Sequence, residues 1–217
     1  MMLINLMKFC KFLLLALVFV LVITTPSSVL AEDSTPLQGY RIVVDPGHGG
    51  RTDPGVIGIN GLKEKELVLD VSFRLRDMIE ELGGDVLMTR ESDIEVPLWS
   101  RTVQAVNYGA DLFISVHANG SYNRNANGIE TYYSRFKPRG DYYLAESLQR
   151  SMVNNLGRKD NGIHHGNFWV LNNAPMTAAL VEIAYVSNRH EEYLLSTNWY
   201  RETAAKAVTE GIVNYVK

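Results

Sequence analysis

The chain has 217 residues, of which 46% are hydrophobic and 21% are charged, which is typical of a soluble globular protein with one good core. Its formal net charge at pH 7 is −3, with 21 Lys and Arg against 24 Asp and Glu. Because nucleic-acid binding depends on clustered Lys and Arg, this balance argues against nucleic acid as the main partner.

The first 31 residues have the pattern of a secretory signal peptide. Lys8 and Lys11 precede an uncharged apolar run of about fourteen residues, and small residues end the segment at Ala31. We therefore expect cleavage after Ala31, secretion, and no stable membrane span in the mature protein. An uncleaved membrane anchor is the alternative, because the run is only slightly shorter than the ~17 residues that a spanning helix needs.

The mature chain that follows contains no cysteine, because Cys10 is the only one in the sequence. A metal site in it would therefore use histidine and carboxylate ligands. Residues 32–39 are expected to form a short flexible tail, and residues 40–217 are expected to form one catalytic domain without an appended binding module.

From Tyr40 onward, short apolar runs alternate with helical patterns, which predicts an α/β fold. The expected architecture is a three-layer sandwich with a twisted, mostly parallel sheet of roughly six strands flanked by helices. The predicted strands are Tyr40–Val44, Asp85–Thr89, Leu112–Val116, Gly128–Tyr133, Phe168–Leu171 and Ala178–Ile183.

The clearest predicted helix lies between the first two strands, where apolar residues from Leu67 to Leu82 recur at three- and four-residue steps and Gly83-Gly84 ends the pattern. Later helices are expected over Pro97–Tyr108 and Tyr142–Gly157. Two more should follow near the end of the chain. The residues assigned to them are the cap Asn188 with Glu191 in a capping box, the cap Asn198, and the inward-facing Trp199, Ala204, Val208 and Ile212.

Chemistry-bearing residues recur where the predicted strands end. His48 follows the first strand, which the turn residues Asp45-Pro46-Gly47 are expected to stop, and His117 follows the third strand. Glu64 begins the first helix, although Glu66 is an equally plausible carboxylate. Ligands of open α/β sheets bind beyond the carboxyl ends of the strands, so these side chains can face one crevice.

Glu182 lies in the otherwise apolar last strand, where a carboxylate without a partner loses several kcal/mol of hydration. Two imidazoles, one carboxylate and an open fourth position form the pattern of catalytic zinc, and a neighbouring glutamate can deprotonate water there. Each residue taken alone also has an ordinary interpretation as a turn, helix-start or ion-pairing residue.

Seven segments together give the chain from about Tyr40 to Lys217 a specific resemblance to the zinc-dependent N-acetylmuramoyl-L-alanine amidases that trim bacterial peptidoglycan. These segments are VVDPGHGG, GLKEKELVLDV, VLMTR, DLFISVHANG, GIETYY, NFWVLNNAPM and ALVEIAYVSN, in the order of the family. The resemblance implies that His48, Glu64 and His117 hold one zinc ion and that Glu182 is the catalytic glutamate.

The chain departs from the family pattern at three places. Val68 replaces the usual Asn, Ala184-Tyr185 replaces Gly-Phe after the catalytic glutamate, and the loop after His48 is one residue longer. None of these changes removes an expected ligand. The change at Ala184 is expected to affect the shape of the pocket wall.

The resemblance implies hydrolysis of the amide between N-acetylmuramic acid and L-alanine in peptidoglycan, by a secreted enzyme acting at the bacterial cell wall. A zinc carboxypeptidase acting on wall peptides and a non-enzymatic wall-binding protein with a degenerate zinc site are the alternatives. Asn119 and Asn167 are candidate substrate contacts. Arg101 either binds stem-peptide carboxylates or braces a loop.

Overall fold

The computed structural model describes residues 35–137 and 139–217. The predicted signal peptide and the first residues of the predicted tail lie outside this part of the chain. None of the helices in the described residues is long and apolar enough to cross a membrane.

The described chain alternates strands and helices as the sequence predicts. The strands are β1 (Arg41–Pro46), β2 (Asp85–Met88), β3 (Leu112–Asn119), β4 (Ile129–Tyr133), β5 (Asp160–His165) and β6 (Thr177–Tyr185). The helices are α2 (Glu64–Glu81), α3 (Leu98–Tyr108), α4 (Gly140–Leu156), α5 (Trp169–Asn173), α6 (Arg189–Leu195) and α7 (Asn198–Val216).

The strands form one six-stranded sheet in the order β2-β1-β3-β6-β4-β5. Strands β2, β1, β3 and β6 run parallel to one another, whereas β4 pairs with β6 in the antiparallel direction and β5 runs parallel to β4. The mostly parallel α/β sheet expected from the sequence is therefore confirmed. The carboxyl ends of β1, β3 and β6 meet at one edge, beside the start of β4.

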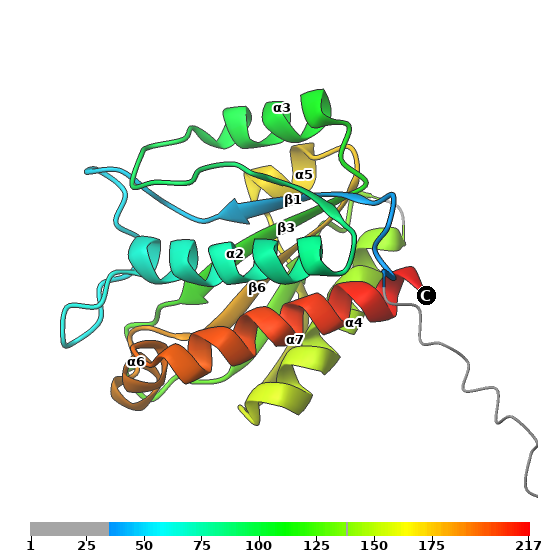
Figure 1. The fold of residues 1–217 in the computed structure, drawn as a ribbon. Coiled ribbons are helices and arrows are strands. Elements are labelled where there is room, and N and C mark those ends of the chain that lie inside the picture. The colour runs from blue at the N-terminus through cyan, green and yellow to red at the C-terminus, as the bar shows by residue number, and fades with distance from the viewer. Residues whose placement is uncertain (1–34, 138) are drawn as a thin grey trace, which may run out of the picture. The chain divides into compact units, whose positions relative to one another are not determined.

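Helices cover both faces of this sheet. Figure 1 shows α2, α4 and α7 on one side of the strands and α3 and α5 on the other. Side chains alternate between these faces along each strand. On β3, Ile114 and Val116 belong to the core under α2, α4 and α7, whereas Phe113 belongs to the smaller core under α3 and α5.

The alternation determines which polar side chains reach which face. Ser115 and His117 share the α3 and α5 face with Phe113, and Glu182 shares it with Leu180, because residues two apart on a strand point to the same side. His117 is the register partner of Glu182 across β3 and β6. The sheet itself therefore brings these two side chains together.

Helix α2 forms for the reason that its periodicity suggests. Its fully buried Leu67, Val71 and Leu75 face the core, while the opposite side carries charged residues. Gly83 then ends the helix with φ 86°, where its backbone N–H bonds to Glu80 O at 3.0 Å. Glu64 is consequently fixed at the first turn of a well-packed helix.

The predicted tail differs from the structure at its end. Residues 36–39 form a turn rather than a solvated extension, and Leu37 is fully buried in the core. The backbone N–H of Leu37 bonds to Leu82 O at 3.1 Å, so this segment packs against the end of α2. A single apolar residue in a polar stretch gives no periodic signal, which is why the sequence indicates a tail.

The predicted fifth strand, Phe168–Leu171, is wrong. Those residues enter the short helix α5, and the fifth strand is β5, from Asp160 to His165. Strand β5 lies at the edge of the sheet and has exposed or half-buried residues throughout, so it lacks the apolar alternation used to predict strands. The strands β1 and β3 also extend further than predicted, through Pro46 and Asn119.

The last two helices begin almost where expected but with different contacts. Asn188 caps α6 as predicted, whereas Glu191 does not close a capping box, because its carboxylate accepts from Gly128, Tyr185 and Arg158. Thr197, rather than Asn198, caps α7. Trp199 is 62% exposed, and Tyr200 takes the inward position instead.

Candidate metal centre and its pocket

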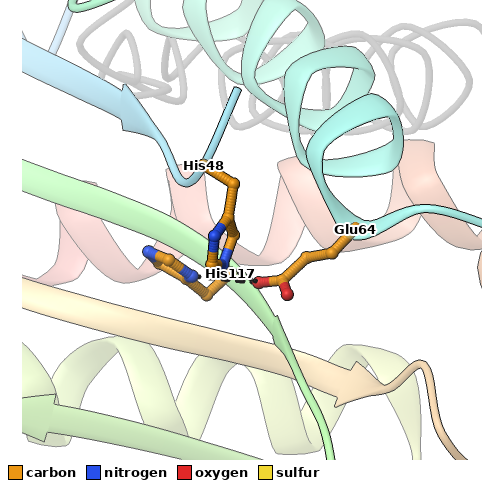
Figure 2. A group of neighbouring side chains, drawn as sticks. All are labelled: His48, Glu64 and His117. Carbon is orange, nitrogen blue, oxygen red and sulfur yellow. Dashed lines mark hydrogen bonds and ion pairs between the residues drawn. The ribbon is translucent and has the colours of Figure 1, made fainter. Parts of the chain in front are cut away.

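Three side chains from distant parts of the sequence meet beyond the carboxyl ends of β1 and β3. Figure 2 shows His48 after β1, Glu64 at the start of α2 and His117 on β3 pointing toward one another. One possible ligand atom from each residue lies within 4.8 Å of the other two. Within the described residues this is the one group of three or more His, Cys, Asp or Glu side chains able to hold a metal ion.

The contacts within the cluster centre on one carboxylate oxygen. Glu64 Oε1 lies 3.1 Å from His48 Nε2 and 2.9 Å from His117 Nδ1. The two imidazole rings lie 4.9 Å apart at their centroids and are nearly perpendicular. Two imidazoles and one carboxylate in this arrangement match the donor set of catalytic zinc sites.

His48 adopts a backbone conformation that a non-glycine residue rarely takes. Its φ is 60°, in the left-handed region, which costs about 1–3 kcal/mol and persists only where the surroundings enforce it. Two buried arginines supply that enforcement. Arg101 donates to His48 O at 2.8 Å and to Pro46 O at 2.7 Å, and Arg90 donates to Gly47 O at 2.8 Å.

Arg101 is held in turn by a buried acid at the end of β1. Asp45 is 1% exposed and accepts from Arg101, from Thr89 at 2.6 Å and from Ser115 at 2.7 Å. Burial alone would raise the pKa of Asp45, but Arg101 and these hydrogen bonds lower it overall. Asp45 and Pro46, two of the three residues expected to form a terminating turn, thus belong to β1, and through Arg101 they anchor the backbone of His48.

Two glycines leave the room that the cluster needs. A Cβ atom at Gly47 would lie 2.2 Å from His117 Cε1, and one at Gly55 would lie 2.6 Å from Glu64 Oε2. Any larger residue at these positions would displace a cluster side chain. The glycine beside His48 is therefore required by the ring of His117, a residue far away in the sequence.

Glu64 is 2% exposed, yet its carboxylate is fully supplied with donors. Besides the two histidines, Val56 N donates to Oε2 at 2.9 Å and Ala118 N donates to Oε1 at 3.1 Å. Burial alone would raise the pKa of Glu64, but His117 and His48 hold it well below its usual value. The carboxylate is thus charged and fixed, as a metal ligand needs to be.

Asp53 fixes the ring of His48 from the other side. Its Oδ1 lies 2.6 Å from His48 Nδ1, so Nε2 is the nitrogen that faces Glu64. Burial alone would lower the pKa of His48, but Glu64 and Asp53 raise it. A carboxylate behind a ligating histidine typically orients the ring and strengthens it as a ligand.

The carboxyl group of Glu182, unlike that of Glu64, lacks hydrogen-bond donors in the described part of the chain. It is 8% exposed, and its Oε2 has no hydrogen-bond partner among the described residues. Burial raises the pKa of Glu182 well above its usual value, and the negative charges of Glu64 and Glu130 raise it further. A buried, unpaired carboxyl group beside a metal-type cluster can take up and release a proton.

Glu130 on β4 is the register partner of Glu182 on its other side. It accepts from Asn119 Nδ2 at 3.0 Å, from Tyr132 OH at 2.7 Å and from Tyr185 OH. The family resemblance places Phe where this chain has Tyr185, so the hydroxyl that reaches Glu130 belongs to a departure from the family pattern. The side chains His117, Glu182 and Glu130 therefore form one row across three strands.

The cluster opens into a pocket of about 630 Å³. One side is lined by Val96, Pro97 and Leu98 at the start of α3, and another by Phe168 and Trp169 at the start of α5. Glu182, Asn119 and the three cluster residues also line it. A largely apolar pocket with a few convergent polar groups is the usual form of a small-molecule or substrate site.

The three predicted substrate contacts, Asn119, Asn167 and Arg101, differ in whether they line the pocket and in whether their polar groups are free. Asn119 lines the pocket, although its amide already donates to Glu130. Asn167 is exposed outside this pocket and accepts from Asn172 at 2.9 Å. The three guanidinium nitrogens of Arg101 all donate to protein oxygens, which favours its bracing role over contact with a substrate.

The positions of the two side chains favour Glu64 over Glu66 as a possible ligand. Glu66 is exposed and accepts from Lys63 Nζ at 3.0 Å, away from the cluster. Asp53 and Glu130 are not predicted from the sequence. Asp53 lies in the loop after β1, and Glu130 lies on β4 between β6 and β5. Asp53 follows His48 by five residues in a Gly- and Pro-rich loop, and that proximity was the one local signal for it.

These features define a class before any comparison: an α/β protein with a two-histidine, one-glutamate metal-type cluster and an unpaired glutamate at the carboxyl edge of its sheet. Comparison with known proteins identifies the family. The model of the N-acetylmuramoyl-L-alanine amidase family matches residues 42–214. The chain therefore belongs to the N-acetylmuramoyl-L-alanine amidase family of bacterial cell-wall hydrolases.

Individual relatives agree with this assignment. The amidase LytC of Bacillus subtilis is 34% identical over 203 residues, which cover 92% of this chain and 40% of LytC. The germination-specific amidase of the same species is 34% identical over 199 residues, covering 84% of this chain and 82% of that protein. Thus this chain spans less than half of LytC but most of the germination-specific enzyme.

A solved structure shows the same fold. The amidase AmiC2 of Nostoc punctiforme superposes with a TM-score of 0.77 at 34% identity, covering 81% of this chain and 96% of that one. Membership in a family of cell-wall amidases implies a peptidoglycan substrate and action outside the cytoplasm.

Proposed function

We propose that this chain hydrolyses the amide bond between N-acetylmuramic acid and L-alanine in peptidoglycan, with one zinc ion held by His48, Glu64 and His117. The observation that carries the proposal is the convergence of these three side chains beside the unpaired carboxyl group of Glu182. The donor set fits zinc, because two imidazoles and a carboxylate leave an open position for water or substrate.

A zinc ion bound there would supply Lewis-acid polarisation of the scissile carbonyl and would acidify the attacking water toward a pKa of about 7. The chain's own residues then handle the proton. Glu182 accepts the proton of the attacking water and passes it to the nitrogen of the departing alanine, so the amine leaves neutral. Its raised pKa and lack of a fixed hydrogen bond suit it to this exchange.

Other residues hold the geometry on which this exchange depends. Asp53 keeps the Nε2 atom of His48 directed into the cluster, and Arg101 and Arg90 hold the backbone on which His48 stands. Arg101 thus acts through His48. We retain Asn119 as a proposed contact for the substrate near the scissile bond and Asn167 as a more distant one.

The zinc carboxypeptidase alternative needs a free cation in the pocket to bind a terminal carboxylate. Arg101 is the one Lys or Arg among the described residues that line the pocket, and its nitrogens already bond to protein oxygens. This observation favours the amidase. A non-enzymatic wall-binding role would leave the energetic cost of burying Glu182 without a purpose.

Product analysis tests the proposal directly. Purified protein incubated with peptidoglycan should release new N-terminal alanine in step with solubilisation of the wall, and a chelator should stop the release until zinc is restored. Release of a C-terminal residue without new N-terminal alanine would instead establish a carboxypeptidase. Wall binding without any cleavage product would establish a binding protein.

The N-terminal segment belongs to the same proposal. We infer that residues 1–31 are a signal peptide cleaved after Ala31, which would deliver residues 32–217 to the wall. N-terminal sequencing of the protein from the culture medium should begin at Glu32. An N-terminus at Met1 in a membrane fraction would indicate a retained anchor.

A further inference from the structure

The aromatic side of the pocket has no part in the chemistry described so far. Phe168 and Trp169 line the pocket where the chain enters α5, and they are 38% and 49% exposed. Two neighbouring exposed aromatic rings in a concave site leave apolar surface in water that a ligand can cover. We call these two residues the aromatic wall.

The position of Phe168 is fixed from behind. Its ring packs edge-on against Tyr132, with centroids 5.1 Å apart, and the hydroxyl of Tyr132 donates to Glu130 at 2.7 Å. A Cβ atom at Gly166 would lie 2.4 Å from the ring of Phe168, so the glycine permits this close packing. Phe168, one of the two residues of the aromatic wall, is therefore held in place by packing from behind.

Neighbouring strands of the sheet place the support of this wall close to Glu182. Tyr132 is the register partner of Leu180, which lines the pocket and lies two residues from Glu182 on β6. Two residues along a strand span about 7 Å. The aromatic wall and Glu182 therefore line one pocket, and Tyr132, which packs against Phe168, lies on the neighbouring strand about two residues along the sheet from Glu182.

The substrate offers two groups of different chemistry on the two sides of the scissile amide. The peptide side carries carboxylates, whereas the other side carries the uncharged pyranose ring of the muramoyl sugar, joined to the scissile carbonyl through a short lactyl ether. A pyranose ring has apolar C–H faces that pack well on aromatic rings. The aromatic wall offers such rings and no cationic side chain for a carboxylate.

We propose that Phe168 and Trp169 bind the muramoyl sugar ring of the substrate. Trp169 then determines the preference for sugar-bearing over sugar-free substrates. This inference rests on the proposed function. The resemblance segment NFWVLNNAPM contains both residues, but their conformation and exposure, rather than their presence in the segment, point to this role. Binding energy at this wall would be used to place the amide at the metal cluster.

Paired substrates and paired tryptophans test this role. The substrates are N-acetylmuramoyl-L-alanyl-D-isoglutamine and the N-lactoyl dipeptide that retains the same amide but lacks the sugar. The variants are Trp169→Ala, Trp169→Phe and the control Trp99→Ala, whose side chain is 60% exposed on α3 and does not line the pocket.

Trp169→Ala should lower kcat/KM on the muramoyl dipeptide about three- to tenfold and leave the lactoyl dipeptide within about twofold of wild type. Trp169→Phe should recover most of the lost kcat/KM on the muramoyl dipeptide, and Trp99→Ala should leave kcat/KM unchanged on both substrates. Equal losses on both substrates, or no loss on either, would overturn the role of Trp169.

A binding measurement separates this inference from the proposed reaction. Calorimetric titration with the peptide-free disaccharide of N-acetylglucosamine and N-acetylmuramic acid should give a Kd that Trp169→Ala raises about three- to tenfold and Trp99→Ala leaves unchanged. Undetectable binding to wild type, or equal Kd values for wild type and Trp169→Ala, would overturn it. If sugar binding behaves as expected but no N-terminal alanine is released, the proposed function fails alone.

Discussion

The two sides of the pocket place buried glutamates in opposite surroundings. Glu64 receives hydrogen bonds from two backbone amides and contacts from two imidazoles, whereas Glu182 Oε2 has no partner among the described residues. The pKa of Glu64 is lowered and that of Glu182 is raised, although both side chains are buried. One residue type thus acquires two chemistries from its neighbours alone.

This difference predicts a division of labour. Changes on the Glu64 side should remove metal and activity together, because that side is the proposed metal site. Changes on the Glu182 side should remove turnover and leave the metal in place. The first three experiments below measure metal binding and turnover separately, and the fourth measures the stability of the metal-free protein.

The largest effect is expected on the metal-holding side. His117→Ala removes one of the three proposed ligands, so the purified protein should contain little zinc and release no detectable N-terminal alanine from peptidoglycan. Metal content by mass spectrometry and alanine release measure the two effects. His190→Ala, which changes an exposed histidine on α6, is the control and should behave as wild type. A zinc content equal to wild type in the His117 variant would show that His117 is not a ligand.

Glu182→Ala should leave zinc content near wild type and lower turnover by about 10²–10⁴-fold, the usual contribution of a positioned acid or base. The loss arises because no other side chain replaces its proton transfer. The same substitution at the exposed Glu66 is the matched control and should retain full turnover. A wild-type rate for Glu182→Ala would show that the proton is carried elsewhere.

An intermediate effect is expected at Asp53. Replacing it with Asn keeps the shape of the side chain but removes the charge that orients and strengthens His48, so zinc affinity should fall about 10–100-fold. Competition with a fluorescent chelator measures that affinity, and excess zinc should restore turnover. Asp70→Asn on the outer side of α2 should have no effect. Unchanged affinity in the Asp53 variant would limit its role to the loop.

The smallest effect concerns stability without metal. A carboxyl group with a higher pKa in the folded than in the unfolded state weakens folding as pH rises past the unfolded value of about 4.3. Because the pKa of Glu182 is raised, Glu182→Gln should increase the Tm of the chelated protein at pH 7–8 by on the order of a few °C. The gain should vanish near pH 4, and a gain that is independent of pH would contradict this explanation.

Much of the fold could be predicted because its core follows simple periodicities. The apolar steps along α2 and the buried runs of β1, β3 and β6 predicted the parallel part of the sheet, and strand ends preceding His48 and His117 located its functional edge. The sequence does not predict strand β5, because an edge strand with polar residues on both sides lacks an apolar alternation. The apolar run Phe168–Leu171 predicts a strand but enters the helix α5, because a short apolar run has no unique period.

The partners of the site residues could not be predicted in the same way. The role of Gly47 depends on the ring of His117, and the row from His117 to Glu130 depends on the register of three strands. Such contacts join residues far apart in the chain, so no local pattern records them. The left-handed backbone of His48 likewise follows from two distant arginines rather than from its neighbours alone.

The most direct test of the central claim is anomalous scattering at the zinc absorption edge from crystals of the purified mature protein. The expected result is one strong peak that marks a zinc ion bound by His48, Glu64 and His117, with zinc–nitrogen distances of about 2.0–2.1 Å. The carboxyl group of Glu182 should lie beside this ion but outside bonding distance. A peptidoglycan-cleaving protein whose crystals show no peak among these three side chains, or a peak held by other residues, would contradict the account.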